Sequence, residues 1–401
     1  MAARTVLFTS VLSAVIAGSC GAASDQAVQP EAVVEAPEPT TQPSLTSTST
    51  APPVDPAPID PGGNDGASGD ANDPSCISDP SPVFTHAYTD LEQIDFISPT
   101  IVTSSNWLKN RQYHKVVTDA DNNAPLVPVY APADATATGI THYLGRMQLW
   151  DGTMLELAQF DVRFEVSCEV RFWFDHISEL AEPFTSLAST DPALDTRDAE
   201  VPIDAAVEAG DLIGYTSGTE PAHTWDFIVV NRSVTNQFAN QERYEQVSEL
   251  VSLLHADCPF DYFEEPLRSQ YRSLIGSWQG RTPGFDCNLE PDVPGTIAGA
   301  WFLTPFDPSL DVNRPDWGLV ANLAADGSVD VNGPGATIRT LADAPTFADP
   351  TTVTTEHCFE DFNRPARHVY VELISDSELA AAFGDGACPA ELPNTYEIFY
   401  R

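Results

Sequence analysis

The segment VEAGDLIGYTSGTEPAHTWDFIVVN, residues 207–231, decides how the first folded part of this chain is organised. An apolar pair, Leu212 and Ile213, lies in a small-residue turn, a polar loop follows, and HTWDF leads into the apolar run 228–230. This order predicts a strand, a loop and a second strand. Side chains alternate between the two faces of a strand, so His223 and Asp226, three residues apart, point to opposite faces unless a bulge intervenes. The two residues therefore need not share one site.

Length and charge limit the classes of protein that the chain can belong to. Its 401 residues leave room for two domains once export and linker segments are set aside. The formal net charge is −41, and the lysines are only Lys109 and Lys115. Such a surface repels nucleic acid and anionic lipid headgroups, and it is typical of a soluble protein in a saline environment. A calcium-binding surface is the alternative, but no Asp-x-Asp-x-Asp-Gly loop supports it.

The N-terminal sequence predicts export. Arg4 precedes a short apolar run, residues 5–17, that is too short to span a membrane as a helix. The run ends in Ala-Gly-Ser-Cys, which resembles a bacterial lipobox, so we expect a signal peptide over residues 1–19 and a lipid on Cys20. Plain secretion stays open, because Ala17 replaces the usual leucine. Residues 20–80 are rich in Pro, Ser and Thr and predict a disordered tether.

An even number of cysteines follows Cys20. In an exported chain such a set predicts disulfides. Sequence order suggests Cys258 with Cys287 and Cys358 with Cys388, which leaves Cys76 with Cys168, although fifteen pairings exist for six cysteines. No Cys-x-x-Cys is present, so a zinc ribbon or a thioredoxin-type site has no support.

Hydrophobic periodicity predicts a mainly β protein with a few helices. Apolar and polar residues alternate over 162–166 and 170–174, as in two antiparallel strands with one buried face, within a β domain over residues 81–235. Helical spacing over 243–255, and a second candidate helix over 264–275, predict a helical connector, residues 236–292. Short apolar segments and the hairpin signal Asp326-Gly327 predict a small all-β C-terminal module, residues 293–401. The predicted strands of this module cover 299–303, 318–322, 336–341, 368–373 and 396–400.

Five segments of the first domain occur in the order that is typical of one enzyme family. They are His114 with Asp119, VYAPADATATG (129–139), FDHISEL (174–180), GDLIGYTSG (210–218) and HTWDF (223–227). Together they resemble an M23 (LytM-like) metallopeptidase domain. The resemblance covers roughly residues 113–230, and the long spacing between His114 and Asp119 points to a divergent branch.

The resemblance implies a zinc site and assigns roles to residues. His114 and Asp119 would be zinc ligands, and His176 and His223 would be the catalytic imidazoles that move protons or steady the oxyanion. The third ligand of the family falls on Trp225, which cannot bind zinc, but Asp226 would supply an oxygen if the strand is bulged. Structural roles compete at the same positions: His176 at a turn, His223 as a satisfied histidine at a strand start, and Asp226 as a solvated carboxylate.

Two functions follow from the resemblance. The first is a zinc endopeptidase that is anchored at the cell envelope through Cys20 and acts on the cross-link peptides of peptidoglycan. The second is a catalytically degenerate M23-like domain that binds cell wall or a protein partner without hydrolysis, as the loss of His-x-His suggests. Neither function involves nucleic acid, and a membrane is contacted only through the lipid anchor. A solute-binding lipoprotein is a third class, but the chain lacks the repeated βα pattern of such proteins.

Overall fold

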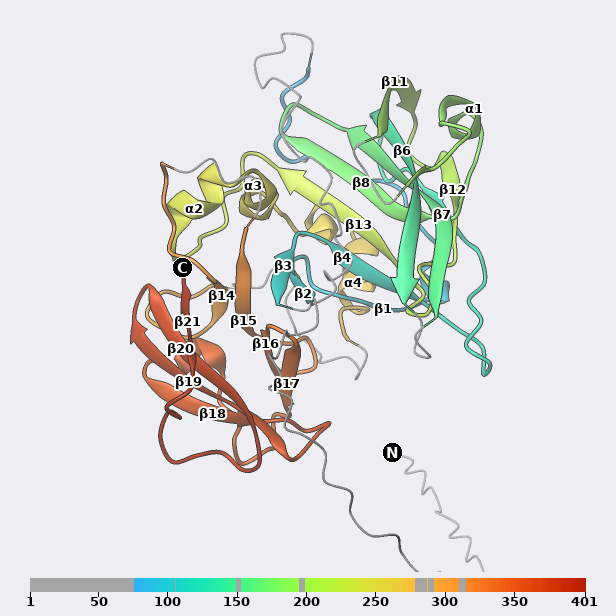
Figure 1. Ribbon diagram of the computed structural model, residues 1–401. Helices are drawn as coiled ribbons and strands as arrows, with labels where there is room; N and C mark the ends of the chain where they lie inside the picture. Colours follow the sequence, from blue (N-terminus) through green and yellow to red (C-terminus); the bar gives the residue numbers. More distant parts are fainter. Residues whose placement is uncertain are drawn as a thin grey trace, which may run out of the picture. The chain divides into compact units, whose positions relative to one another are not determined.

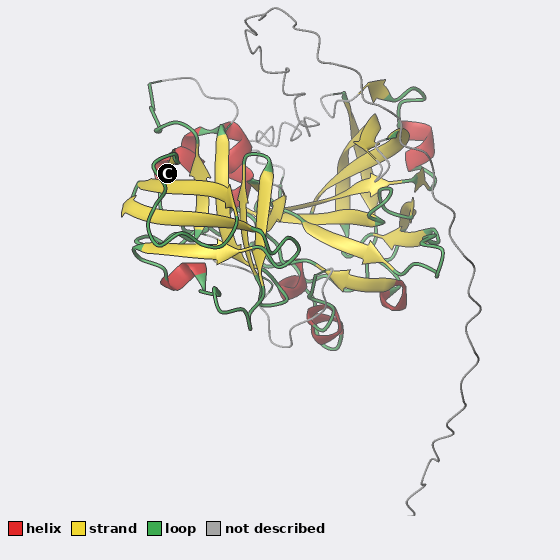
Figure 2. Ribbon diagram, turned by 60° about the horizontal axis from the view of Figure 1, so that its bottom comes forward, coloured by secondary structure: helices red, strands yellow, loops and turns green. Residues whose placement is uncertain are grey.

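The structure is a computed structural model, and it describes residues 76–104, 106–148, 153–194, 199–277, 287, 292–309 and 315–401. Every described residue belongs to one compact unit, Pro56–Arg401. Cys20, the expected signal peptide and most of the expected tether lie outside the described residues. Within the described part the fold is mainly β with a few short helices, as expected from the sequence (Figures 1 and 2).

The largest sheet of the first half carries the candidate site. Its strand order is β1-β4-β13-β8-β7-β6-β10, and β11 pairs with β6. Figure 1 shows the long strands β6, β7, β8 and β13 side by side in green to yellow. The strands are β1 (Ile94–Ile97), β4 (Gln112–Val116), β6 (Ala135–Gln148), β7 (Met154–Glu165), β8 (Val170–Ile177), β10 (Ala193–Leu194), β11 (Glu200–Val207) and β13 (Thr224–Asn231).

A smaller sheet joins segments that are distant in sequence. Strand β12 (Leu212–Thr216) pairs on one side with β5 (Val127–Tyr130) and on the other with the two-residue β9 (Glu179–Leu180), in the order β5-β12-β9. A hairpin of β2 (Val102–Ser104) and β3 (Trp107–Lys109) stands apart from both sheets. The expected strand, loop and strand of residues 207–231 are therefore present as β12, a loop and β13.

Alternation along β8 and β13 separates an apolar face from a polar one. Phe172 and Phe174 on β8 and Trp225 and Phe227 on β13 belong to the main core cluster and are almost fully buried. Their ring centroids lie within contact distance, for example 5.0 Å between Phe174 and Phe227. The residues between them therefore point to the opposite face of the sheet. Asp226 is one of these residues.

The described residues of the segment 236–292, where a helical connector is predicted, form only short helices. The segment predicted as one helix over 243–255 forms α2 (Gln241–Gln246) and α3 (Ser248–Leu254), because Val247 between them has extended backbone angles. The helix expected over 264–275 is only α4 (Leu267–Arg272). The other helical segments are α1 (Phe184–Leu187), η1 (Leu91–Gln93), η2 (Pro259–Tyr262) and η3 (Pro350–Thr352).

The C-terminal part forms one antiparallel sheet of eight strands in the order β17-β16-β15-β14-β21-β20-β19-β18, coloured orange to red in Figure 1. All five expected strands are present, and the Asp326-Gly327 turn joins β15 to β16 as expected. Strands β16, β18 and β20 were not predicted from the sequence. The strands are β14 (Gly299–Phe302), β15 (Trp317–Leu323), β16 (Val329–Gly333), β17 (Ala336–Thr340), β18 (Glu356–Glu360), β19 (Arg367–Ser375), β20 (Glu378–Asp385) and β21 (Glu397–Tyr400).

Three disulfides are present, and they have the pairing that sequence order suggests. They join Cys76 to Cys168, Cys258 to Cys287 and Cys358 to Cys388. Disulfides of this kind form and persist in oxidising compartments, so they are typical of an exported protein. Among the described helices, none combines the length and the apolar character that crossing a membrane would require.

Candidate functional site

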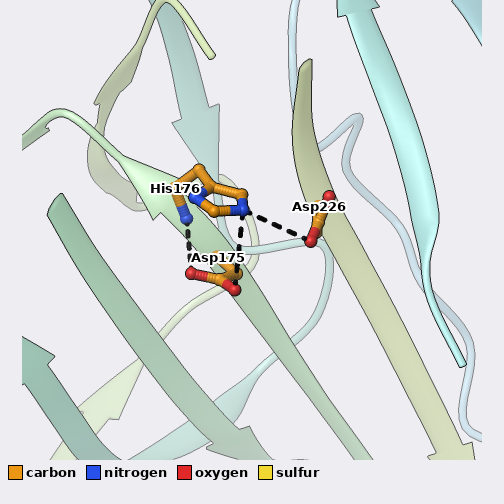
Figure 3. A group of neighbouring side chains, drawn as sticks. All are labelled: Asp175, His176 and Asp226. Atoms are coloured by element: carbon orange, nitrogen blue, oxygen red, sulfur yellow. Dashed lines mark hydrogen bonds and ion pairs between the residues drawn. The ribbon is translucent and has the colours of Figure 1, made fainter. Parts of the chain in front are cut away.

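The candidate site is built on a direct pairing of two aspartates. Asp175 on β8 lies opposite Asp226 on β13 in the antiparallel register, and both side chains are buried, with 2% and 0% of their surface exposed. Like charges that face each other across two strands destabilise a sheet. His176 follows Asp175, and Figure 3 shows its imidazole next to both carboxylates. Among the described residues, these three are the group whose donor atoms lie close enough to hold a metal ion, within 4.8 Å of one another.

Arg111, just before β4, supplies positive charge to the two carboxylates. One guanidinium nitrogen, Nη1, lies 2.8 Å from Asp226 Oδ2 and 3.7 Å from Asp175 Oδ2. Its side chain is only 12% exposed, so solvent screens the pair weakly. Lys109 on β3 adds to this charge: burial lowers the pKa of its ammonium group, and the fields of Asp226 and Asp175 act in the opposite direction. The two carboxylates therefore have cationic partners from the chain itself.

Residues from β6 and β7 orient the imidazole of His176. Its Nδ1 lies 2.9 Å from Gln159 Oε1, which only accepts hydrogen bonds, so Nδ1 carries the proton and donates. Tyr143 donates its hydroxyl hydrogen to Asp175 Oδ1 at 2.6 Å. His176 Nε2 then faces the carboxylates, 3.8 Å from Asp175 Oδ2 and 3.7 Å from Asp226 Oδ2. This is the orientation in which an imidazole binds a cation through Nε2.

His176 has an uncommon backbone conformation. Its φ of 67° lies in the left-handed region, which costs free energy for a residue with a side chain. Two hydrogen bonds hold it: its own N–H donates to Asp175 Oδ1 at 2.8 Å, and its carbonyl accepts from the Thr216 hydroxyl at 2.6 Å. Thr216 lies on β12, within the GDLIGYTSG segment. The turn at the end of β8 is therefore fixed by the residue before it and by the smaller sheet.

The protonation states of the group follow from these contacts. Burial alone would raise the pKa of the Asp175 carboxyl, but His176, Arg111 and the Tyr143 hydroxyl together hold that pKa below its usual value. Burial, and then the charge of Asp175, raise the pKa of Tyr143 well above its usual value. Asp175 is therefore ionised at neutral pH, and Tyr143 stays a neutral hydrogen-bond donor.

The group has the donors for a divalent metal ion, but one of its carboxylates already has a cationic partner. Two carboxylates and an imidazole suit zinc, and separations of 3.7–3.8 Å between Nε2 and the carboxylate oxygens match ligands that lie about 2.0–2.2 Å from one ion. Asp226 Oδ2, however, is also the atom that Arg111 contacts at 2.8 Å. A zinc ion on this oxygen would lie next to the guanidinium and would have to displace it. The residues as they stand fit a cluster that is partly neutralised by arginine better than a resident zinc ion.

The expected set of metal ligands does not form, because alternation along the strands separates its members. His114 is opposite Trp225 in the register of β4 and β13, on the apolar face, and is 0% exposed. Its ring packs against that of Trp225 at a tilt of 30°, with centroids 4.7 Å apart, and its Nε2 accepts a hydrogen bond of 2.6 Å from the Tyr88 hydroxyl. Burial lowers the pKa of His114 to about 3, so it is a neutral core residue.

Asp119 and His223 lie near each other, away from the group of Asp175. Asp119 is exposed, and its carboxylate accepts hydrogen bonds from Asn123. Asn122 connects the two, because its backbone N–H donates to the Asp119 carbonyl and its side chain lies 3.3 Å from His223 Nε2. His223 is 1% exposed at the start of β13 and also lies 3.5 Å from Glu220. The structure thus brings together His176 and Asp226 of the expected residues, and no bulge in β13 is needed to do so.

Four residues that contact His176 or Asp226 or orient them were not predicted from the sequence: Arg111, Tyr143, Gln159 and Asp175. Only Asp175 had a local signal, because it precedes His176 within FDHISEL. Tyr143 and Gln159 are directly opposite each other in β6 and β7, and this pairing appears only once the strand register is known. Arg111 reaches the group through the pairing of β4 with β13.

No family model matches the chain, and no curated protein matches it. The chain is similar to one solved structure, the NMR solution structure of lysostaphin, with 13% sequence identity over 79% of this chain and 97% of that chain. The TM-score is 0.23, so this likeness supports no argument about function.

Proposed function

We propose that the first β domain is an M23-like module that binds cell-wall peptide without hydrolysing it. The family and the target in this proposal come from the sequence resemblance alone, and two structural features support its non-hydrolytic form. The first is the arrangement of the family-like segments around His176. The second is the position of Arg111.

The segments that resemble the M23 family lie on adjoining strands. VYAP in β5 pairs with LIG in β12, and β12 pairs with the Glu-Leu of FDHISEL in β9. The Phe-Asp of FDHISEL, in β8, pairs with the Asp-Phe of HTWDF in β13. Segments up to about a hundred residues apart in sequence thus surround His176, which supports a common origin with M23 domains.

The observation that carries the non-hydrolytic form is the contact of 2.8 Å between Arg111 and Asp226. Zinc peptidases need an ion with an open position for water. Here a guanidinium contacts the carboxylate oxygen that would hold the ion, and the other expected ligands lie on the far face of the sheet or in a loop. The two side chains of the site that are partly exposed to solvent are an imidazole and a guanidinium: His176 is 16% exposed and Arg111 is 12% exposed. Such groups suit the carboxylates and carbonyls of a peptide.

Co-sedimentation with purified peptidoglycan sacculi tests the proposal. The mature wild-type protein is expected to sediment with sacculi and to release no new amino groups, with or without added zinc. His176→Ala is expected to weaken the sedimentation, and Asp119→Asn, outside the group, is the matched control that leaves it unchanged. The proposal fails if the wild type does not bind sacculi, or if it cleaves them.

A zinc endopeptidase is the second candidate, and one specific observation favours it. Asp226 Oδ1 is buried, and no described residue gives it a hydrogen bond. A metal ion would satisfy a buried carboxylate oxygen of this kind. Zinc titration by calorimetry separates the two candidates. Uptake of zinc by the wild type that disappears in Asp226→Asn, together with zinc-dependent cleavage of sacculi, would establish the enzyme.

Anchoring at the envelope is a separate part of the proposal. The three disulfides support export, and the expected lipid on Cys20 would hold the β domains close to the wall. Mass spectrometry of the mature N-terminal peptide tests this, with Cys20→Ser as the control. A wild-type peptide without lipid mass would contradict it.

A further inference from the structure

A cavity with a volume of about 170 Å³ lies against one face of the C-terminal sheet within the unit Pro56–Arg401. One wall comes from three neighbouring strands: Asn322 on β15, Asp330 on β16 and Arg339 on β17. These residues are directly opposite one another in the register, so they form one row across the sheet. Their neighbours along the strands, such as Val331 and Ile338, belong to the core on the other face.

The polar row has hydrogen-bonding atoms that nothing in the described part of the chain satisfies. Asn322 Oδ1, Asp330 Oδ1 and Arg339 Nε are all buried without a hydrogen-bond partner there, and so is Oγ1 of Thr103, which also lines the cavity. Asp330 Oδ1 and Arg339 Nε are 3.7 Å apart, which is too far for a hydrogen bond. Four unsatisfied polar atoms around one cavity indicate a ligand with both donors and acceptors.

The charges around the row determine which groups the ligand carries. Arg339 is held at its other end by Asp326, through a hydrogen bond of 2.7 Å, so its Nε stays directed at the row. Burial raises the pKa of Asp330 to about 6, although Arg339 acts to lower it. Asp330 and Asn322 thus present two acceptor oxygens that suit an ammonium group, and Arg339 presents a donor that suits a carboxylate.

The rest of the lining is mostly apolar, with Ser98, Tyr113 and Ser277 as its polar residues, and it sets the size of the ligand. Phe96, Ile101 and Val102 on one side and Ala324 and Ala325 on the other surround the space. An apolar cavity of about 150 Å³ holds benzene, which has six heavy atoms. We propose that this cavity binds a free α-amino acid with a small apolar side chain, its ammonium group at Asp330 and Asn322 and its carboxylate at Arg339. The inference does not depend on the peptide-binding function proposed for the Asp175 group.

Calorimetric titration of the full mature chain with L-valine and two analogues tests the inference. Isobutylamine is valine without its carboxylate, and 3-methylbutanoate is valine without its ammonium group. Valine is expected to bind, and each analogue is expected to bind at least about tenfold more weakly, because each leaves one end of the polar row unsatisfied. Alanine and leucine, titrated in the same way, define the size limit.

Variants locate the binding in the cavity. Asp330→Asn keeps the shape but removes the charge, and it is expected to weaken valine binding at least about tenfold. Ala324→Leu, which fills the apolar side, is expected to abolish it. Asp343→Asn changes an exposed aspartate of the same module and is expected to leave it unchanged. Thermal unfolding of each variant checks the fold, and the analogue series on the wild type does not depend on any variant. The inference is overturned if none of the three amino acids binds, if either analogue binds as tightly as valine, or if folded Asp330→Asn binds valine as the wild type does.

Discussion

At the scale of single residues, Arg111 determines the chemistry of the candidate site. Without it, Asp175 and Asp226 would face each other across two strands, both buried and both negative. The arginine stabilises this arrangement by a close contact with Asp226 and a longer one with Asp175. The same contact occupies the carboxylate oxygen that a metal ion would need.

Removing this arginine should destabilise the domain. For Arg111→Gln we expect a loss of about 3–5 kcal/mol in the free energy of unfolding, because a buried ion pair loses one partner. Asp226→Asn in the same chain should restore part of that loss, since it removes the uncompensated charge. Urea unfolding of the two single variants and the double variant measures this. Strictly additive losses would contradict the coupling that the distances indicate.

His114 gives the second prediction at this scale, and it concerns pH. Burial lowers its pKa to about 3 in the folded protein, whereas the pKa of a histidine in an unfolded chain is about 6.5. The unfolded state therefore binds more protons between these values, so stability falls as the pH drops below about 6.5. His114→Gln has no titrating group at this position. Between pH 6.5 and pH 4.5 we therefore expect its free energy of unfolding to fall by about 2–3 kcal/mol less than that of the wild type. Parallel stability curves for wild type and variant would show that His114 is not buried in neutral form.

At the scale of elements, the glycines of the GDLIG segment position the smaller sheet. Gly214 lies where β12 pairs with β9, and a Cβ at this position would overlap the carbonyl oxygen of Glu179. Because β9 begins three residues after His176, a shift of either strand would move the turn that holds the imidazole. A glycine is therefore needed at position 214, because strands β12 and β9 approach each other closely there.

Gly214→Ala should accordingly destabilise the protein by at least about 2 kcal/mol, since backbone has to move. Gly335→Ala is the matched control: Gly335 has a φ of 72° with nothing within 4 Å of an added Cβ. It should cost only the conformational penalty, about 1–2 kcal/mol. Thermal unfolding of both variants gives the comparison. An effect of Gly214→Ala no larger than that of the control would mean that β9 does not pack so closely.

At the scale of the whole molecule, disulfides connect segments that the net charge of −41 drives apart. Cys76–Cys168 closes a loop of 92 residues and joins the start of the described chain to the turn between β7 and β8. Cys358–Cys388 closes a loop of 30 residues at the end of the C-terminal sheet. Both crosslinks restrict the unfolded chain, and the longer loop restricts it more.

Replacing both cysteines of either pair with serine should lower stability, by about 4–5 kcal/mol for Cys76–Cys168 and by about 3–4 kcal/mol for Cys358–Cys388. Thiol titration of the denatured, unreduced wild type should find none of these four cysteines free. Chemical unfolding at fixed pH and salt measures the losses. Free thiols in the wild type, or variants as stable as the wild type, would contradict the pairing.

The sequence by itself determined the features that depend on local pattern. Alternation predicted β7 and β8, the apolar pair and loop predicted β12 and β13, and cysteine order suggested the disulfides. It also placed His223 and Asp226 on opposite faces, because that follows from the period of a strand alone. Helix lengths were overestimated, since the extended backbone at Val247 depends on packing and not on hydrophobic spacing.

Only the tertiary structure decided which side chains meet. Asp175 and Asp226 are neighbours because β8 pairs with β13, and Arg111 reaches them because β4 pairs with the other edge of β13. These pairings join residues far apart in the chain, and no local pattern fixes their register. The family resemblance assigned zinc to His114 by position in the sequence. In the observed register, the His114 side chain lies in the aromatic core, and Arg111 lies beside the two carboxylates. A difference of one residue in register would exchange the two faces of a strand.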